Sequence, residues 1–265
     1  MSPPKLAHAA FDFPEPGLAV LTIDRPPVNA LGRDLVADLE AACGWLESEP
    51  PVSAPRALVV AAKGKVFCAG ADLKERQSMT VEDVRAWVPR LSGLFTRIAS
   101  LPMPTIAVVH GVAAGGGMEL ALACDLRVAE EQASLGLRET ALAILPGAGG
   151  TQRLPRLIGP SRAKRWIFTA ALHSAAEALI DGAVDAVAPS LEGLALALKW
   201  GRAVAANGPV AVRLAKRAVD GGLGLPMPEA LEHERRCYEG VLGTEDRLEA
   251  LAAFREKRDP RFVGR

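Results

Sequence analysis

The first half of the chain alternates short apolar runs with segments of helical periodicity, and this alternation constrains the fold more than any other feature. Residues 18–23, 56–62, 105–110 and 126–129 have the length and composition of buried strands. Between the first two, residues 32–49 carry apolar side chains at helical spacing. Strands that alternate with helices favour a parallel sheet joined by right-handed crossovers. The sequence therefore predicts an α/β fold.

The remaining elements follow from the same pattern. A long helix is expected over 81–100, a shorter one after the three glycines at 115–117, and a break at the proline-rich stretch 50–55. From Gly149 onward the pattern is helical, apart from one short strand near 184–187. Helical segments are expected near residues 161–170, 174–181, 190–206, 208–220, 228–241 and 244–257.

Length, charge and cysteine content narrow the class of protein. A chain of 265 residues, 49% of them hydrophobic, buries a core without needing a disulfide or a metal. Basic and acidic residues balance at 31 each, so no overall field attracts nucleic acid or an anionic membrane. The four cysteines, Cys43, Cys68, Cys124 and Cys237, are far apart and lack the spacing of metal ligands. We expect a reduced compartment and no metal site.

The opening residues and the longest apolar runs bear on location. The first ten residues contain neither the apolar core of a secretory signal nor the arginines of a transit peptide. No apolar run approaches the 18 or more residues of a membrane-spanning helix. These features predict a cytoplasmic protein with no membrane span.

Two glycine-containing loops are candidates for ligand binding. In the first, residues 64–74, an apolar segment runs into Ala-Gly-Ala-Asp, whose small residues allow the backbone to approach a ligand. In the second, residues 111–120, three glycines precede a helix whose first turn contains Glu119. Free N–H groups at a helix N-terminus suit an anion or a developing oxyanion. Ordinary tight turns are the alternative, whereas a phosphate loop fails because neither GxGxxG nor Gly-Lys-Ser/Thr is present.

A third segment contains a second carboxylate in apolar surroundings. Glu139 lies between the apolar stretch at 135–137 and an Ala-Leu-Ala-Ile run, where a solvated charge is unusual. The sequence continues into a glycine-rich run at 145–154. The simpler alternatives are that Glu139 caps a helix and that Thr151 caps the next one.

Together, three segments resemble the hallmark stretches of the enoyl-CoA hydratase/isomerase (crotonase) family, in order and spacing. They are Cys-Ala-Gly-Ala-Asp-Leu-Lys at 68–74, Gly-Gly-Gly-Met-Glu-Leu-Ala at 115–121 and Pro-Gly-Ala-Gly-Gly-Thr-Gln-Arg at 146–153. The similarity extends from about residue 18 to residue 258 and is greatest to the methylglutaconyl-CoA hydratase type. This resemblance implies a spiral of ββα repeats over residues 1–200 and a C-terminal helical oligomerisation region over 201–265. It further implies a homotrimer or homohexamer.

The resemblance also implies an enzyme and its catalytic residues. The backbone N–H groups of Ala71 and Gly116 match those that hold the thioester oxygen, and Glu119 and Glu139 match the two carboxylates that act on one water. Family hydratases add water in syn fashion to a trans-2-enoyl-CoA and give a 3-hydroxyacyl-CoA. Isomerases of this fold keep one of the two carboxylates, so the presence of both favours hydration. Another reaction on the same fold and a non-catalytic family member are the alternatives.

Substrate contacts are implied by the same comparison. Coenzyme A is expected to bind as part of the acyl-CoA substrate, with no separate cofactor. Lys257 is expected to reach it across a subunit boundary. The other positions matching coenzyme A contacts are Arg25, Val28, Ala69, Asp72, Leu73 and Lys74. Trp87, Leu91 and Met118 are candidates for the acyl pocket.

Two departures from the family pattern affect function. Arg138 stands where relatives commonly have proline or an aliphatic residue, and its charge either points away from Glu139 or keeps that carboxylate ionised. The methylglutaconyl-CoA hydratase type also binds AU-rich RNA through a lysine-rich helix. Residues 32–49 here contain one arginine, no lysine and five acids. No nucleic-acid partner is therefore expected.

Overall fold

A twisted six-stranded sheet forms the centre of the molecule. The computed structural model describes residues 2–48 and 53–265. The strand order is β1-β2-β3-β4-β6-β9, in which β1 is antiparallel to β2 and the other neighbours are parallel. The strands are β1 (Ala9–Asp12), β2 (Leu18–Ile23), β3 (Ala57–Ala62), β4 (Thr105–Val109), β6 (Leu126–Glu130) and β9 (Ala186–Ala188).

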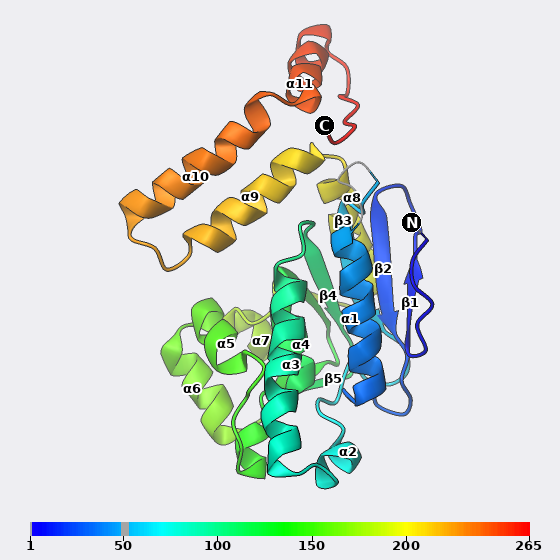
Figure 1. The fold of residues 1–265 in the computed structure, drawn as a ribbon, viewed down its shortest axis with the longest axis vertical. Coiled ribbons are helices and arrows are strands. Elements are labelled where there is room, and N and C mark those ends of the chain that lie inside the picture. The colour runs from blue at the N-terminus through cyan, green and yellow to red at the C-terminus, as the bar shows by residue number, and fades with distance from the viewer. Residues whose placement is uncertain (1, 49–52) are drawn as a thin grey trace.

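Both faces of this sheet are buried, which explains why its strands read as continuous apolar runs. Alternate side chains of β3 point to opposite faces: Leu58 and Val60 pack toward α1 and α3, whereas Val59 packs toward α8. Figure 1 shows α1 (Arg33–Ser48) and α3 (Val81–Ala99) in front of the sheet and α8 (Gly193–Ala205) behind it. The sheet and these helices form a layered α/β core.

A second, smaller sheet gives the core its spiral form. It contains β5 (Val112–Ala114), β7 (Ser134–Gly136) and β8 (His173–Ser174). Two isolated parallel bridges add further extended segments: Cys68 pairs with Ala113 of β5, and Leu31 pairs with Ala71. Each turn of the chain thus contributes a long strand, a short extended segment and a helix. This confirms the crotonase-like fold that the resemblance implied.

The C-terminal helices project from the core as an arm (Figure 1). The arm consists of α9 (Pro209–Gly222), α10 (Met227–Leu242) and α11 (Glu245–Glu256). Lys216 of α9 forms an ion pair with Asp125 at the start of β6. Arg56 donates to the carbonyl oxygens of Ala205 at 2.9 Å and Phe262 at 2.7 Å, which ties the chain end to the core.

The remaining helices surround the small sheet or precede it. They are α2 (Leu73–Gln77), α4 (Gly116–Ala123), the 3-10 helix η1 (Glu139–Leu142), α5 (Gly150–Ile158), α6 (Pro160–Thr169) and α7 (Ala175–Asp181). None of the described helices is long and apolar enough to cross a membrane. All four cysteines are buried and free.

The periodic pattern predicted the long elements and missed the short ones. The strand expected at 18–23 and the helices expected at 81–100 and 208–220 lie within two residues of those observed. The small sheet and the antiparallel β1 were missed, because strands of two to four residues are too short to show alternation. The helix α8 continues past the expected boundary at residue 200 and packs on the sheet, so the arm begins at Pro209. The predicted break at 50–55 lies partly outside the described residues.

Candidate active site

Two backbone N–H groups without an acceptor among the described residues lie where the first and second glycine loops touch. Ala71 lies in a parallel bridge in which Leu31 donates to Gly70 and Asp72 donates to Leu31, so this pairing leaves the N–H of Ala71 unused. Gly116 is the first residue of α4, where an N–H has no partner within the helix. A Cβ added to Gly116 would lie 3.8 Å from the nitrogen of Ala71. The structure therefore brings together the two predicted oxyanion donors.

The glycines of these loops are required by the closeness of the two backbones. A Cβ on Gly70 would lie 2.6 Å from the carbonyl oxygen of Ala114, and Gly70 itself has a φ of +91°. A Cβ on Gly117 would overlap the carbonyl oxygen of Cys68. These contacts are with backbone, which cannot move aside as a flexible side chain can. The repeated glycines thus have a geometric reason, as the sequence suggested.

Glu119 lies three residues after Gly116 in the first turn of α4 and is almost completely buried. Its Oε1 accepts hydrogen bonds from the backbone nitrogens of Ala148 and Gly150, both at 2.8 Å. Its Oε2 accepts none from the described residues. The pKa of Glu119 is raised by burial, and the two N–H donors and the charge of Arg153 only partly oppose this rise. This carboxylate is held in place and partly stabilised in its charged form.

Glu139 is the first residue of η1 and approaches the same region from another loop. A Cβ added to Gly115 would lie 3.0 Å from its Oε1, which places this carboxylate beside the start of α4. Its Oε2 is buried and has no hydrogen-bond partner in the described part of the chain. Burial, followed by the charge of Glu119, raises the pKa of Glu139 to about 7. A carboxyl group with this pKa holds a proton at neutral pH for much of the time.

The charge of Arg138 does not act on the neighbouring carboxylate. Its side chain is exposed, and its charge is not among the causes that shift the pKa of Glu139. Only its backbone N–H lowers that pKa. Of the two alternatives for this residue, the structure supports a surface charge that points away.

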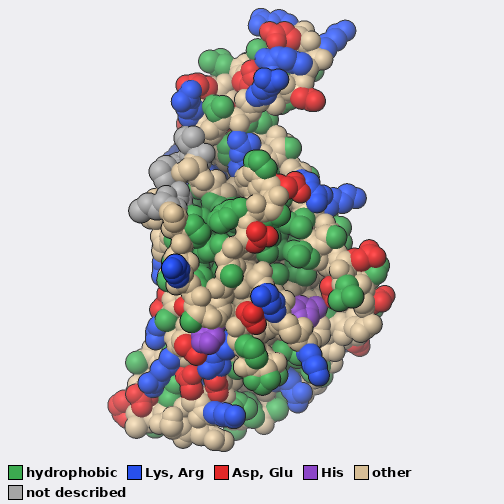
Figure 2. Space-filling view, turned by 90° about the vertical axis from the view of Figure 1, so that its right-hand side faces the viewer, with side chains coloured by type: hydrophobic (Ala, Val, Ile, Leu, Met, Phe, Trp, Pro, Cys, Tyr) green, Lys and Arg blue, Asp and Glu red, His purple; other side chains and the backbone are tan. Residues whose placement is uncertain are grey.

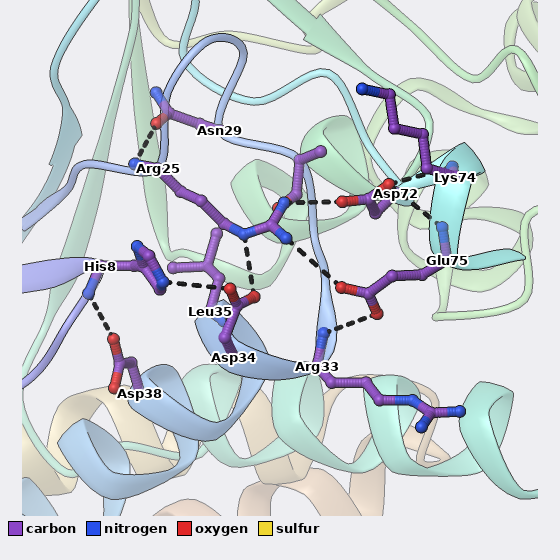
Figure 3. Close-up of polar contacts among 11 residues, drawn as sticks. His8, Arg25, Asn29, Arg33, Asp34, Leu35, Asp38, Asp72, Lys74 and Glu75 are labelled. Atoms are coloured by element: carbon purple, nitrogen blue, oxygen red, sulfur yellow. Dashed lines mark hydrogen bonds and ion pairs between the residues drawn. The ribbon is translucent and has the colours of Figure 1, made fainter.

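Arg25 is fully engaged by carboxylates on its own chain (Figure 3). Its guanidinium forms ion pairs with Asp34 at 2.8 Å, Asp72 at 2.8 Å and Glu75 at 3.3 Å. Its Nη1 also donates to the carbonyl oxygen of Ala30 at 3.1 Å. Asp72 in turn caps α2 by accepting from Lys74 and Glu75. Arg25 and Asp72 thus hold the loop that carries Ala71, and their expected contact with coenzyme A stays a prediction.

Asn29 is a structural residue of this region that the sequence did not indicate. It is buried with a φ of +51°, and its Nδ2 donates to the carbonyl oxygens of Lys63 and Val66 at 2.8 and 2.9 Å. Its Oδ1 accepts from the backbone nitrogen of Arg25. A signal was available, because asparagine tolerates a left-handed conformation better than most residues. Asn29 ties the β2–α1 loop to the first glycine loop.

The other expected substrate contacts lie at the surface or in the core. Residues Val28, Ala69, Leu73 and Lys74 are exposed around α2, where a ligand has access to them. Lys257 is at the C-terminal end of α11, at the opposite end of the molecule from α2 (Figure 1). Lys257 therefore cannot reach the α2 region of its own chain.

The three residues expected to line the acyl pocket are all buried: Trp87, Leu91 and Met118. They belong to the main hydrophobic cluster. Val88 was missed, although it lies on α3 beside the loop that holds Glu119: a Cβ on Gly147 would lie 2.8 Å from its Cγ1. Val88 is half-buried, so its side chain is better placed than those of Trp87 and Leu91 to meet a ligand.

Two backbone N–H donors beside one buried and one half-buried carboxylate form a site suited to stabilising an oxyanion and transferring protons. The comparisons identify the family. The chain belongs to the enoyl-CoA hydratase/isomerase family, whose model matches residues 14–265. This confirms the family predicted from the three motifs.

Individual relatives agree over nearly the whole chain. It is 46% identical to mouse "Enoyl-CoA hydratase domain-containing protein 2, mitochondrial", over 99% of this chain and 90% of that protein. It is 44% identical to human "Methylglutaconyl-CoA hydratase, mitochondrial", over 94% and 74% of the two chains. The crystal structure of an enoyl-CoA hydratase from Bacillus anthracis matches with a TM-score of 0.94 and 43% identity, and covers 98% of this chain and 100% of that one.

The predicted cytoplasmic location is wrong, because both of these curated relatives are named as mitochondrial proteins. That prediction rested on the composition of the first ten residues. The residues that build the fold and the site carry no information about the cellular compartment, so they could not correct this prediction.

Proposed function

We propose that this protein is an enoyl-CoA hydratase that adds water in syn fashion to a trans-2-enoyl-CoA and forms a 3-hydroxyacyl-CoA. The observation that carries the proposal is the presence of two carboxylates, the buried Glu119 and the half-buried Glu139, beside the N–H groups of Ala71 and Gly116, which have no acceptor among the described residues. A thioester oxygen held by the two N–H groups becomes an enolate oxygen when water attacks C3. One carboxylate then accepts the proton that leaves water, and the other donates a proton to C2.

The surroundings of the carboxylates support a division of roles. Glu119 receives two backbone hydrogen bonds and is the better carboxylate for accepting a proton from water. Glu139 has a pKa of about 7, so it holds a proton that it can deliver to C2. Two titratable groups whose surroundings push their pKa values apart are suited to opposite roles in proton transfer. Coenzyme A enters as part of the substrate, and the exposed Lys74 is a candidate for its phosphates.

A subunit assembly is part of the proposal. Large apolar side chains of α10 and α11 are exposed, including Leu231, Tyr238, Leu248, Leu251 and Phe254. Figure 2 shows further hydrophobic side chains gathered on the face below the arm. Burying such surfaces favours a homotrimer or homohexamer, in which Lys257 would approach the coenzyme A of a neighbouring subunit. Light scattering that gives a monomer at micromolar concentration would contradict this assembly.

The test of activity is to follow the absorbance of the conjugated enoyl thioester. We expect the absorbance of crotonyl-CoA to fall as 3-hydroxybutyryl-CoA forms. A panel of unbranched, branched and carboxylated 2-enoyl-CoA substrates then identifies the preferred acyl group. A 3-enoyl-CoA serves as the control for double-bond migration. The proposal fails if the 3-enoyl-CoA is isomerised while no member of the panel is hydrated, and also if neither reaction occurs.

A further inference from the structure

Arg153 is the charged residue of the 146–153 motif that the proposed mechanism leaves without a role. It lies on α5 and is half-buried. Its Nη1 donates to the carbonyl oxygen of Ala148 at 2.9 Å, and its Nη2 lies 3.4 Å from Oγ1 of Thr96 on α3. Burial lowers the pKa of Arg153, whereas the charge of Glu119 opposes this shift. The guanidinium is therefore close enough to Glu119 for the two charges to interact.

Ala148 connects the two side chains. Its carbonyl oxygen accepts from Arg153, and its N–H donates to Oε1 of Glu119 at 2.8 Å. The orientation of this one residue therefore depends on Arg153 on one side and determines a hydrogen bond to Glu119 on the other. The second donor to Oε1, the N–H of Gly150, follows two residues later.

Gly149 lies beside Arg153. Its φ of +114° is a conformation that L side chains rarely adopt, and a Cβ at this position would also overlap Nη1 of Arg153 unless that side chain moved. The backbone of residues 148–150 therefore lies between the guanidinium and Glu119, and position 149 contributes no side chain there. The glycines of the motif and its arginine form one arrangement around a single carboxylate.

We propose that Arg153 is a positioning residue for Glu119: it fixes residues 148–150 so that both N–H groups converge on Oε1, and its charge favours the ionised carboxylate. This inference rests on the proposed hydration reaction. The charged groups that face Glu119 are Arg153 from α5 and Glu139 from η1. The charge of Arg153 lowers the pKa of Glu119, and the charge of Glu119 in turn raises the pKa of Glu139. Arg153 thereby helps to keep the negative charge on Glu119.

The test compares Arg153→Gln, Arg153→Lys and Arg156→Gln. Arg156 is an exposed residue of the same helix that bonds only to Gln152 among the described residues, so it is a matched control. For Arg153→Gln we expect kcat/KM to fall roughly 10- to 100-fold. We also expect the acidic limb of its pH profile to move to higher pH, because Glu119 loses a cation. Arg153→Lys should restore the acidic limb but only part of the rate, since lysine keeps the charge without the planar donor geometry.

Each outcome separates the inference from simpler explanations. The inference is overturned if Arg153→Gln has the rate and the pH profile of wild type. It is also overturned if this variant has a lower rate and a lower thermal midpoint while the acidic limb of its pH profile does not move. An equal shift in Arg156→Gln would also overturn it, because the effect would then be one of net charge. If the wild-type protein hydrates no enoyl-CoA, the proposed function fails and the role of Arg153 in hydration is overturned with it. If the wild-type protein is an active hydratase and the variants give any of the contrary results above, the inference alone is overturned.

Discussion

Glu119 and Glu139 lie in one site, but the loops around them treat the two carboxylates differently. Residues 148–150 direct two N–H groups and, through Arg153, a positive charge toward Glu119. Glu139 has backbone N–H groups beside it, those of Glu139 and Arg138, but no cation among the causes that shift its pKa, and its buried Oε2 has no partner among the described residues. The pKa values of both carboxylates are raised by burial, and the difference teaches that backbone donors and a neighbouring cation limit this rise at Glu119, whereas the charge of Glu119 adds to it at Glu139.

The largest expected effect comes from replacing the carboxylates themselves. Glu119→Gln and Glu139→Gln should each lower kcat by ~10²–10⁴-fold, because glutamine cannot accept or release a proton at neutral pH. The double variant should lose far less than the product of the two single losses, since both groups serve one water. Steady-state hydration rates of the four proteins check this. Should Glu119→Gln stay near wild type while Glu139→Gln is inactive, a one-carboxylate isomerase becomes the better assignment.

A smaller effect is expected from adding a methyl group behind each carboxylate. In Gly150→Ala the new Cβ would lie 2.9 Å from Cβ of Pro146 and 3.0 Å from Leu137, so the N–H that bonds Glu119 must shift. We expect kcat/KM to fall by about tenfold and the acidic limb of its pH profile to move to higher pH.

Gly115→Ala is the matching change behind Glu139. The φ of Gly115 is +53°, and the new Cβ would lie 3.0 Å from Oε1 of Glu139. We expect a stability loss of about 1–3 kcal/mol from the strained backbone and a change in the alkaline limb. Chemical denaturation and pH–rate profiles of both variants measure these effects. Equal shifts in both limbs for both variants would mean that the carboxylates are not held separately.

The sequence predicted which carboxylates matter but not how they differ. Glu119 and Glu139 were identified from motifs, and the long strands from their apolar composition. The donors to Glu119 are 29 and 31 residues away in the chain, so only the folded structure shows them. Arg25 illustrates the same limit: two of its three carboxylate partners, Asp72 and Glu75, are 47 and 50 residues away, and the motif comparison did not indicate these ion pairs.

A third prediction concerns stability and pH. The folded pKa of Glu139 is about 7, above its ordinary value of 4.5, so the native state binds this proton more tightly than the unfolded chain. Its contribution to stability is therefore complete below pH 4.5 and is lost as the pH rises through 7. Glu139→Gln has no such loss. The free energy of unfolding of this variant, relative to that of wild type, should therefore rise by about 1–2 kcal/mol from pH 5 to pH 8, after allowance for solvent screening.

Thermal or urea unfolding at the two pH values measures this difference. Glu119→Gln serves as the comparison, and its gain should be smaller because the N–H donors and Arg153 already stabilise the charged form of Glu119. A larger gain for Glu119→Gln than for Glu139→Gln would reverse the assignment of acid and base.

The smallest effect is expected at Arg138, the residue next to Glu139. Its side chain is exposed and its charge does not shift the pKa of Glu139, whereas its backbone N–H does. Arg138→Gln keeps that N–H, so kcat/KM should change by less than about twofold, as for most surface substitutions. The alkaline limb of the pH profile should stay in place. If it moved to higher pH, the guanidinium would be stabilising the ionised form of Glu139. Each carboxylate would then have its own arginine, and the contrast between the two sites would be one of degree.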